Sequence, residues 1–221
     1  MEKEIYKRTS TWFISDLHIG HNNVLRFEEG LHNFKDIKDH DHTIAKNWHE
    51  TVGQEDHVFF LGDLAMERTK LKHIRENLGK FGKLPGKVHW IIGNHDLHIN
   101  QEWLNNLGEI MDIVEFTVYK EILVEGECLI EPRKIVLFHY PLYEWNGKYR
   151  GAYHIYGHSH AHVHPLPGTM SACACITGYT PVNVDWMINK IEELKCKLAN
   201  PLKELTSTTK DIIKSNLQNT E

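Results

Sequence analysis

The sequence predicts an α/β fold built as one domain. Its 221 residues, of which 41% are apolar, are enough to bury one hydrophobic core. Short apolar segments typical of strands alternate with amphipathic segments typical of helices through the first half of the chain, and glycines separate them. This alternation implies parallel strands joined by right-handed crossovers. In such a sheet, ligands bind beyond the carboxyl ends of the strands.

The first expected strand covers residues 10–15, and two polar side chains follow it. Asp16 and His18 are separated by one residue, so an extended backbone would turn both toward the same side. A carboxylate and an imidazole placed in this way can bind one metal ion, although Asp-x-His also occurs often without a metal. Gly20 then lets the chain turn away.

An amphipathic helix is expected over residues 34–52, ending near Gly53. Apolar residues recur in it at helical spacing among charged ones: Ile37, Ile44, Ala45 and Trp48. We expect the three histidines of this segment to be solvated: His40, His42 and His49.

A second short strand, residues 58–61, ends in Gly62-Asp63. Helical spacing resumes from Thr69 to Leu78. Asn and Asp form turns readily, so a single acid after a strand is unremarkable.

The third strand, residues 88–92, leads into Gly93-Asn94-His95-Asp96. A polar group now follows three strands along the chain. Parallel pairing would bring Asp16, Asp63 and Asn94 to one edge of the sheet. That convergence is the main prediction of the first half.

The second half changes character. A short helix is expected over residues 101–107, followed by alternating segments at 113–119, 121–124 and 128–130. Gly126 supports a hairpin between the last two, so this half is expected to be antiparallel and meander-like.

Two later strands deliver histidines. Residues 134–138 lead to His139, and a further strand leads to Gly157-His158-Ser159-His160, where the glycine lets the backbone approach closely. His162 and His164 continue the alternation. Because a metal ion accepts few ligands, we expect these two to be exposed or to support the ligands.

The chain closes with a helix and a polar tail. Asp185 stands where it could cap the start of the helix. The apolar face of this helix is expected to pack on the sheet: Ile188, Ile191, Leu194 and Leu198. Residues 201–221 are rich in Ser, Thr and Lys, and we expect a helical or partly disordered tail after a domain of residues 1–200.

Composition disfavours some classes of partner. The formal net charge of −5 disfavours tight binding to nucleic acid or to an anionic membrane. No apolar run approaches the roughly 18 residues that span a bilayer, so we expect a soluble, cytoplasmic protein. The cysteines form no CxxC pair and are expected to be reduced: Cys128, Cys173, Cys175 and Cys196.

The polar blocks after the strands form an ordered set: Asp16-x-His18, Gly62-Asp63, Gly93-Asn94-His95-Asp96, His139 and Gly157-His158-x-His160. In this order they resemble the five signature blocks of the calcineurin-like metallophosphoesterase superfamily. The resemblance covers about residues 11–190, and the opening from Asp16 to Asn23 is similar to the D-x-H-x-G-H-x-N opening of small bacterial and phage members. It implies a four-layer α/β/β/α sandwich of two mixed sheets.

The resemblance also implies two divalent metal ions. Their ligands would be Asp16, His18 and His160 for the first ion, Asn94, His139 and His158 for the second, and Asp63 as the bridge. Mixed carboxylate, imidazole and amide ligands suit Mn²⁺, which we expect, or Fe²⁺, Zn²⁺ or Ni²⁺. Two such ions about 3.5–4 Å apart can hold a hydroxide that attacks phosphorus.

His95 and Asp96 are the expected catalytic residues. Because Asn94 already has a ligand role, the His95 imidazole could reach the leaving oxygen as general acid or transition-state stabiliser. Asp96 would then orient that imidazole. The alternative is that His95 is an ordinary loop residue and Asp96 a turn former.

The expected activity is hydrolysis of phosphodiesters, with small or cyclic-nucleotide-type diesters as substrates. Phosphomonoesters and single-stranded nucleic acid are alternative substrates. Two non-catalytic readings are a vestigial binding scaffold and a metal-storage site over residues 154–164. Candidate substrate-binding residues are Asn22, Asn23, Arg26 and Tyr143. The sequence leaves the oligomeric state open.

Overall fold

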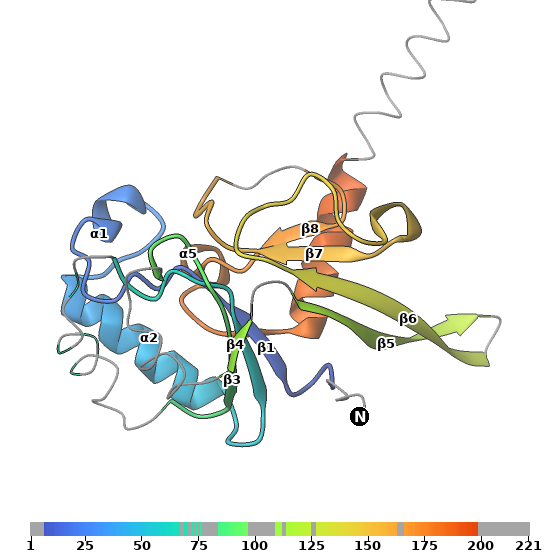
Figure 1. Cartoon of the computed structure of the whole chain (residues 1–221), viewed down its shortest axis with the longest axis horizontal. Coiled ribbons are helices and arrows are strands. Elements are labelled where there is room, and N and C mark those ends of the chain that lie inside the picture. The colour runs from blue at the N-terminus through green and yellow to red at the C-terminus, as the bar shows by residue number, and fades with distance from the viewer. Residues whose placement is uncertain are drawn as a thin grey trace, which may run out of the picture.

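The computed structural model describes residues 7–66, 69, 72, 74, 76, 84–96, 109–111, 114–124, 127–162 and 166–198. Within these ranges the chain is α/β, and its strands form two sheets (Figure 1). The short helical elements are α1 (Val24–Phe27), η3 (Lys148–Arg150) and α5 (Ala174–Thr177). The α/β class expected from the sequence is confirmed.

The first sheet has the strand order β4-β3-β2-β1-β9. Its strands are β1 (Thr11–Ile14), β2 (His57–Phe60), β3 (Lys87–Ile91), β4 (Glu109–Met111) and β9 (Val182–Asn183). β1, β2, β3 and β4 pair in parallel, and β9 runs antiparallel to β1. The predicted parallel pairing of the first three strands is therefore confirmed.

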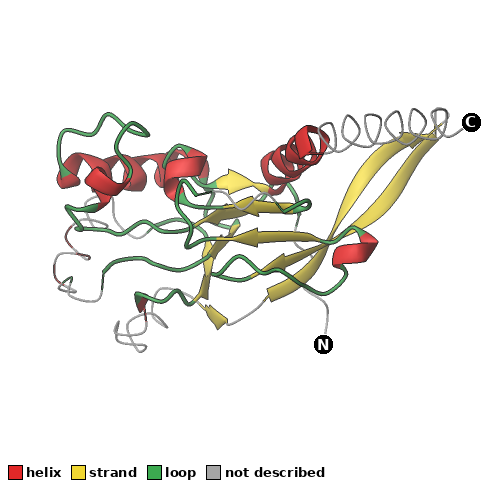
Figure 2. Ribbon diagram, turned by 90° about the horizontal axis from the view of Figure 1, so that it is seen from above, coloured by secondary structure: helices red, strands yellow, loops and turns green. Residues whose placement is uncertain are grey.

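The second sheet has the order β5-β6-β7-β8. Its strands are β5 (Val114–Val124), β6 (Glu127–Leu137), β7 (Tyr153–Tyr156) and β8 (Thr169–Ser171). β5 and β6 form an antiparallel hairpin that extends away from the other strands in both views (Figures 1 and 2). The predicted hairpin is confirmed.

Two predictions about this half are wrong. The expected short segments are in fact two continuous strands, because β5 and β6 keep one register through Pro132, which pairs opposite Tyr119. The described pairing of β6 with β7 begins at Ile135, so the missing proline amide interrupts no pairing on that side. Nor is the sheet a meander, since β6, β7 and β8 are parallel to one another.

Helix α2 (Ile37–Thr51) packs on one face of the first sheet. Asp36 caps it by accepting hydrogen bonds from the backbone N–H groups of Lys38 and Asp39. Its buried Ile44 and Trp48 belong to the same apolar cluster as the strand residues Phe60 and Trp90. The helix predicted over residues 34–52 is therefore present in a slightly shorter form.

The opposite face of the first sheet shares a core with the second sheet. Phe13 and Phe59 cluster with Ile135 and Ile155 of the second sheet. Residues 184–198 form the C-terminal helix, and its buried residues join this cluster: Met187, Ile188 and Ile191. Strand alternation explains the division, because neighbouring residues Phe13 and Ile14 point into different clusters.

Asn183, not Asp185, caps the C-terminal helix. The backbone N–H of Trp186 donates to Asn183 Oδ1 at 2.9 Å. The helix begins two residues earlier than the Asp185 cap requires, at residue 184, and Asp185 instead pairs with Arg8. The predicted packing of Ile188 and Ile191 is confirmed.

His40 is buried, contrary to the expectation of a solvated residue. Its Nδ1 lies 2.9 Å from Asp41 Oδ1, and Asp41 Oδ2 accepts the backbone N–H of Gly20. This side of α2 therefore faces the loop after β1, where the buried polar pair is hydrogen-bonded. His42 is exposed and His49 is partly buried.

Several predicted features lie outside the described residues: the helix at 101–107, His164 and the tail at 201–221. Most of the helix from Thr69 to Leu78 does too, although residues 72, 74 and 76 are helical and Ile74 is buried. The described cysteines Cys173, Cys175 and Cys196 are free thiols. None of the described helices combines the length and the apolar character needed to cross a membrane.

Candidate metal centre

The ends of strands from both sheets meet at one edge. Asp16, Asp63 and Asn94 follow β1, β2 and β3, as the parallel pairing requires. Backbone hydrogen bonds join the loops, from Asp16 N–H to Gly62 O at 2.9 Å and from Gly157 N–H to His139 O at 2.9 Å. Two further hydrogen bonds, from His158 N–H to Asp16 Oδ1 at 3.0 Å and between His139 Nδ1 and Leu61 O at 2.7 Å, join the loops of the second sheet to those of the first.

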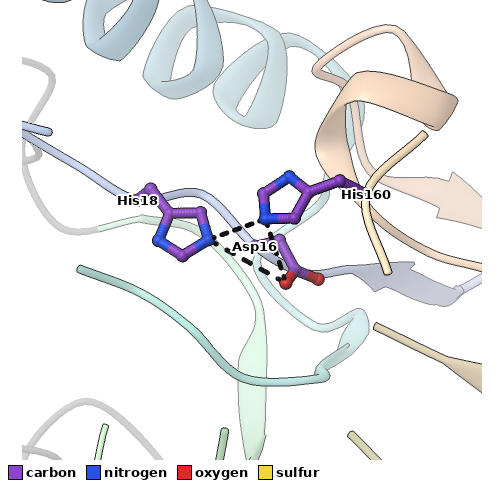
Figure 3. A group of neighbouring side chains, drawn as sticks. All are labelled: Asp16, His18 and His160. Atoms are coloured by element: carbon purple, nitrogen blue, oxygen red, sulfur yellow. Dashed lines mark hydrogen bonds and ion pairs between the residues drawn. The ribbon is translucent and has the colours of Figure 1, made fainter. Parts of the chain in front are cut away.

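A first cluster consists of Asp16, His18 and His160 (Figure 3). His18 Nε2 and His160 Nε2 are 3.1 Å apart, and Asp16 Oδ1 lies 4.0 and 3.9 Å from them. Two imidazole nitrogens bound at right angles to one ion, each at about 2.1 Å, would be about 3.0 Å apart. The spacing therefore suits one metal ion.

A second cluster contains Asp63, His139 and His158. Asn94 joins it, because its Oδ1 lies 3.0 Å from His139 Nε2 and 2.9 Å from His158 Nδ1. Asp63 Oδ2 is 3.6 Å from His139 Nε2. These atoms provide the mixed carboxylate, amide and imidazole set expected from the sequence.

Asp63 stands between the two clusters. The same oxygen, Oδ2, that lies 3.6 Å from His139 Nε2 also lies 4.0 Å from His18 Nε2. Its other oxygen accepts the backbone N–H of His95 at 2.9 Å. One carboxylate oxygen therefore faces both groups of possible ligands.

The backbone is strained at these positions. Among the described residues, positive φ angles outside glycine occur at Asp16, His18, Asp63, His158, His160 and Tyr179. All but the last are candidate ligands. A left-handed backbone costs non-glycine residues on the order of 1–3 kcal/mol each, so the surrounding fold must hold it. Strain concentrated on ligand candidates is typical of functional sites.

Glycines allow the loops to approach one another. A Cβ on Gly62 would lie 2.5 Å from Gly93 N and 2.7 Å from His139 Nδ1. A Cβ on Gly157 would lie 2.7 Å from Asp16 Oδ2. All three distances are shorter than real Cβ contacts, so the close approach predicted for Gly157 is confirmed.

Hydrogen bonds orient the side chains of the candidate ligands. His139 Nδ1 lies 2.7 Å from the carbonyl oxygen of Leu61. A carbonyl only accepts, so Nδ1 carries the proton and Nε2 is left to bind a metal. Asp16 accepts the backbone N–H of His158 at 3.0 Å and the Cys173 thiol at 3.1 Å.

Burial sets the charges of the metal-free site. Burial and the neighbouring His160 hold the pKa of His18 well below its usual value, which favours the neutral imidazole. Burial also raises the pKa of Asp63 to about 6, with the charge of Asp16 adding to the effect. A cation between these groups would favour ionised Asp63 and neutral His18.

Glu28 is a residue of the site that the sequence did not reveal. It lies directly after α1 and is buried, with Oε1 2.7 Å from His160 Nδ1. Burial opposes its ionisation, but hydrogen bonds from His160 and Tyr179 lower the pKa of Glu28 overall. A Glu between a short apolar segment and Gly30 reads as a turn residue, so local sequence offered no signal.

His95 lies beside the first cluster. Its ring centroid is 5.6 Å from that of His18, with the rings edge to face, and its side chain is partly exposed. Asp96 is buried, and its oxygens accept backbone N–H groups from both strand ends: Asp63 at 2.7 Å, Leu64 at 3.0 Å and Gly93 at 2.9 Å. Asp96 thus joins the exits of β2 and β3. Orientation of His95 by Asp96 stays a prediction.

The substrate-binding candidates are all exposed: Asn22, Asn23, Arg26 and Tyr143. Tyr143 lies under the Lys148 ammonium, with Nζ 4.5 Å from the ring centroid. Tyr140 contacts the second cluster, since its ring centroid is 4.7 Å from that of His158. His162 is exposed, as expected.

Comparison with known proteins places the chain among relatives without described functions. No protein-family model matches it. An uncharacterized protein of Methanocaldococcus jannaschii is 28% identical over 191 residues, covering 83% of this chain and 92% of its own. The gene 66 proteins of Mycobacterium phages L5 and D29 are 40% identical over 88 residues and 27% identical over 170 residues. They cover 40% and 70% of this chain, and 40% and 80% of their own length.

One solved structure supports the fold. A protein of unknown function from Aquifex aeolicus aligns with a TM-score of 0.53 and 22% sequence identity. The alignment covers 82% of this chain and 98% of that one. At this identity the likeness concerns the α/β fold alone.

Proposed function

We propose that this protein is a metal-dependent phosphoric ester hydrolase of the calcineurin-like metallophosphoesterase type, with phosphodiesters as preferred substrates. The observation that carries the proposal is the position of Asp63 Oδ2, within 4.0 Å of both His18 Nε2 and His139 Nε2. A carboxylate oxygen between two sets of ligands suits a pair of divalent cations. The four-layer α/β/β/α sandwich belongs to the same proposal, since one core joins α2 to the first sheet and another joins the two sheets.

The donor groups fit such a pair. His18 and His160 approach nitrogen to nitrogen, which is unfavourable between neutral rings unless a proton or a cation lies between them. Buried Asp63 is likewise destabilised in its charged form, and a cation would reverse this. When bound, two divalent cations would polarise the phosphoryl oxygens and lower the pKa of water. Mn²⁺ is the preferred metal for these mixed ligands.

His95 would supply a proton at the leaving oxygen. Its ring lies edge to face with His18 while its side chain remains partly exposed, so it borders the first cluster and also faces solvent. Its backbone N–H is held by Asp63, which places the imidazole relative to the bridging carboxylate. A proton donor in this position is worth on the order of 10²–10⁴ in rate.

Exposed aromatic rings favour a diester with an aromatic substituent. Tyr140 packs on His158 and is 39% exposed. Beside the first cluster, the ring centroid of His21 lies 6.3 Å from that of His18 and 6.5 Å from that of Phe27. Phe27 is 76% exposed. Rings near both clusters could stack on the substituents of a diester, such as nucleobases.

The contacts of His154 weaken the alternative that residues 154–164 form a metal-storage site. This histidine is buried, with Nδ1 3.0 Å from Val136 O, and its Nε2 accepts the backbone N–H of Leu142 at 3.0 Å. Both ring nitrogens are therefore used by the backbone. His154 therefore has a structural role, whereas His158 and His160 remain available as metal ligands.

The test begins with protein stripped by a chelator and reloaded with Mn²⁺. Its substrates are bis-p-nitrophenyl phosphate, p-nitrophenyl phosphate, 2′,3′- and 3′,5′-cyclic nucleotides and a single-stranded oligonucleotide. We expect two bound ions per chain, hydrolysis of diesters above monoesters, and loss of ion pairing and activity in Asp63→Asn. The surface variant Glu50→Gln is the matched control.

Other results would change the assignment. Faster hydrolysis of the monoester than of the diesters would identify the protein as a phosphomonoesterase instead of a phosphodiesterase. Two bound ions without hydrolysis of any substrate would indicate a binding scaffold. Full activity in Asp63→Asn would overturn the proposed site.

A further inference from the structure

Glu28 is a carboxylate buried inside the protein behind the first cluster. It is 1% exposed, whereas its neighbour Glu29 is exposed. Buried carboxylates are rare unless their oxygens are hydrogen-bonded. Both oxygens of Glu28 are: Oε1 lies 2.7 Å from His160 Nδ1, and Oε2 accepts the Tyr179 hydroxyl at 2.8 Å.

The bond to Glu28 determines which nitrogen of His160 is available. An ionised carboxylate only accepts, so His160 Nδ1 must carry the proton. His160 Nε2 is then left for the first cluster, where it lies 3.1 Å from His18 Nε2 (Figure 3). A carboxylate behind a metal-binding histidine orients the ring and makes it a stronger ligand.

Several contacts fix the position of Tyr179. Its φ angle is 57°, and five of the candidate ligands also have positive φ angles. A bulky side chain strongly disfavours this conformation. Its backbone N–H donates to Ala174 O at 2.7 Å, and its carbonyl accepts Asn47 Nδ2 at 3.0 Å. Its ring packs edge to face against Phe34. These contacts compensate for the strain and direct the hydroxyl at Glu28.

We propose that Glu28 and Tyr179 are positioning residues: Glu28 holds the His160 ring with Nε2 toward the cation, and Tyr179 holds Glu28. This inference rests on the proposed function, in which His160 is a metal ligand. It adds a chain of contacts that runs from Tyr179, in the loop after α5, through Glu28 to His160 in the first cluster. Tyr179 acts through Glu28 and is not itself among the candidate ligands.

The test measures Mn²⁺ binding by titration calorimetry in the full-length chain. Glu28→Gln keeps the size of the side chain but removes its charge, and Tyr179→Phe removes one hydroxyl. We expect the dissociation constant of the affected ion to rise about 10- to 100-fold in Glu28→Gln, and less in Tyr179→Phe. Two exposed residues provide the matched controls, Glu29→Gln and Tyr149→Phe, and these variants should bind as the wild type does.

A double variant separates positioning from general packing. Because Tyr179 acts through Glu28, Glu28→Gln/Tyr179→Phe should bind Mn²⁺ no more weakly than Glu28→Gln alone. Thermal unfolding in excess chelator provides a second measurement. In each variant, the free energy of unfolding without ions should change by less than the free energy of Mn²⁺ binding. If Glu28→Gln does not fold, Tyr179→Phe alone still shows whether affinity falls.

The outcomes distinguish the inference from the function on which it rests. Wild-type binding of two ions together with unchanged affinity in Glu28→Gln overturns the role of Glu28 and leaves the proposed function standing. Fully additive losses in the double variant overturn the dependence of Tyr179 on Glu28. A wild-type chain that binds no Mn²⁺ overturns both the inference and the proposed function.

Discussion

The backbone N–H of His95 donates a 2.9 Å hydrogen bond to Asp63 Oδ1, while Asp63 Oδ2 faces both clusters of candidate ligands. The residue proposed to protonate the leaving group is therefore tied to the residue proposed to bridge the cations. These residues follow different strands, so the parallel pairing of β2 with β3 is what brings them together. Both metal binding and rate should therefore be measured for a variant of either residue.

Asp63→Asn should stabilise the metal-free protein above pH 6. Burial raises the pKa of Asp63 to about 6, so the folded chain holds this proton more tightly than the unfolded chain does. Stability is therefore lost as the pH rises from the ordinary range of an aspartate toward 6. Removing the charge should recover on the order of 1–3 kcal/mol at pH 7.5.

The check for Asp63→Asn is urea unfolding in chelator at pH 7.5 and at pH 4. The advantage of the variant should shrink at the lower pH, where the wild-type side chain is protonated in the folded protein. Equal stability of the two proteins at pH 7.5 would contradict a destabilised carboxylate. With Mn²⁺ present the order should reverse, because the wild type alone gains the binding energy of paired ions.

His95→Ala should keep both ions and lose rate. The imidazole borders the first cluster without being one of its ligands, so kcat on a phosphodiester should fall by on the order of 10²–10⁴. The check is kcat alongside Mn²⁺ stoichiometry from elemental analysis. Loss of an ion with unchanged activity per bound ion would show that His95 is a ligand instead.

Asp96→Asn should destabilise the fold at the exits of β2 and β3. The native carboxylate accepts three backbone N–H groups, and an amide in its place would turn a donor toward at least one of them. A buried group left without its partner costs about 1–3 kcal/mol. Urea denaturation with chelator present measures this, with Glu50→Gln as the exposed control. A rate loss without any loss of stability would favour the catalytic role instead.

Phe27→Ala and Tyr140→Ala should weaken binding of substrates that carry aromatic groups. Stacking on one ring is worth about 1–3 kcal/mol, so KM for bis-p-nitrophenyl phosphate should rise about tenfold in each variant. kcat should change less, because neither side chain is among the candidate ligands. Tyr149→Ala, which removes an even more exposed ring, is the control. An equal rise in KM for that control would argue against a specific stacking role.

The sequence by itself determined three strands of the first sheet, β1, β2 and β3, and the polar groups at their ends. Each of those features is local: an apolar run of four or five residues and, within three residues of its end, an acid or amide, preceded by a glycine at Gly62-Asp63 and Gly93-Asn94. Parallel pairing follows from the alternation of strands with helices, and it carries Asp16, Asp63 and Asn94 to one edge without further information. Gly157 could be read in the same way, because a close approach requires a residue without a Cβ.

Only the tertiary structure decided how the site is supported. Glu28 meets His160 across 132 positions of sequence, and Tyr179 reaches Glu28 across 151. Asp96 looked like a partner for its neighbour His95, yet its oxygens accept backbone groups of another strand end. The burial of His40 and the parallel course of β7 beside β6 also depend on which elements pack together. Contacts of this kind have no periodicity along the chain, so they exist only once distant segments have folded against one another.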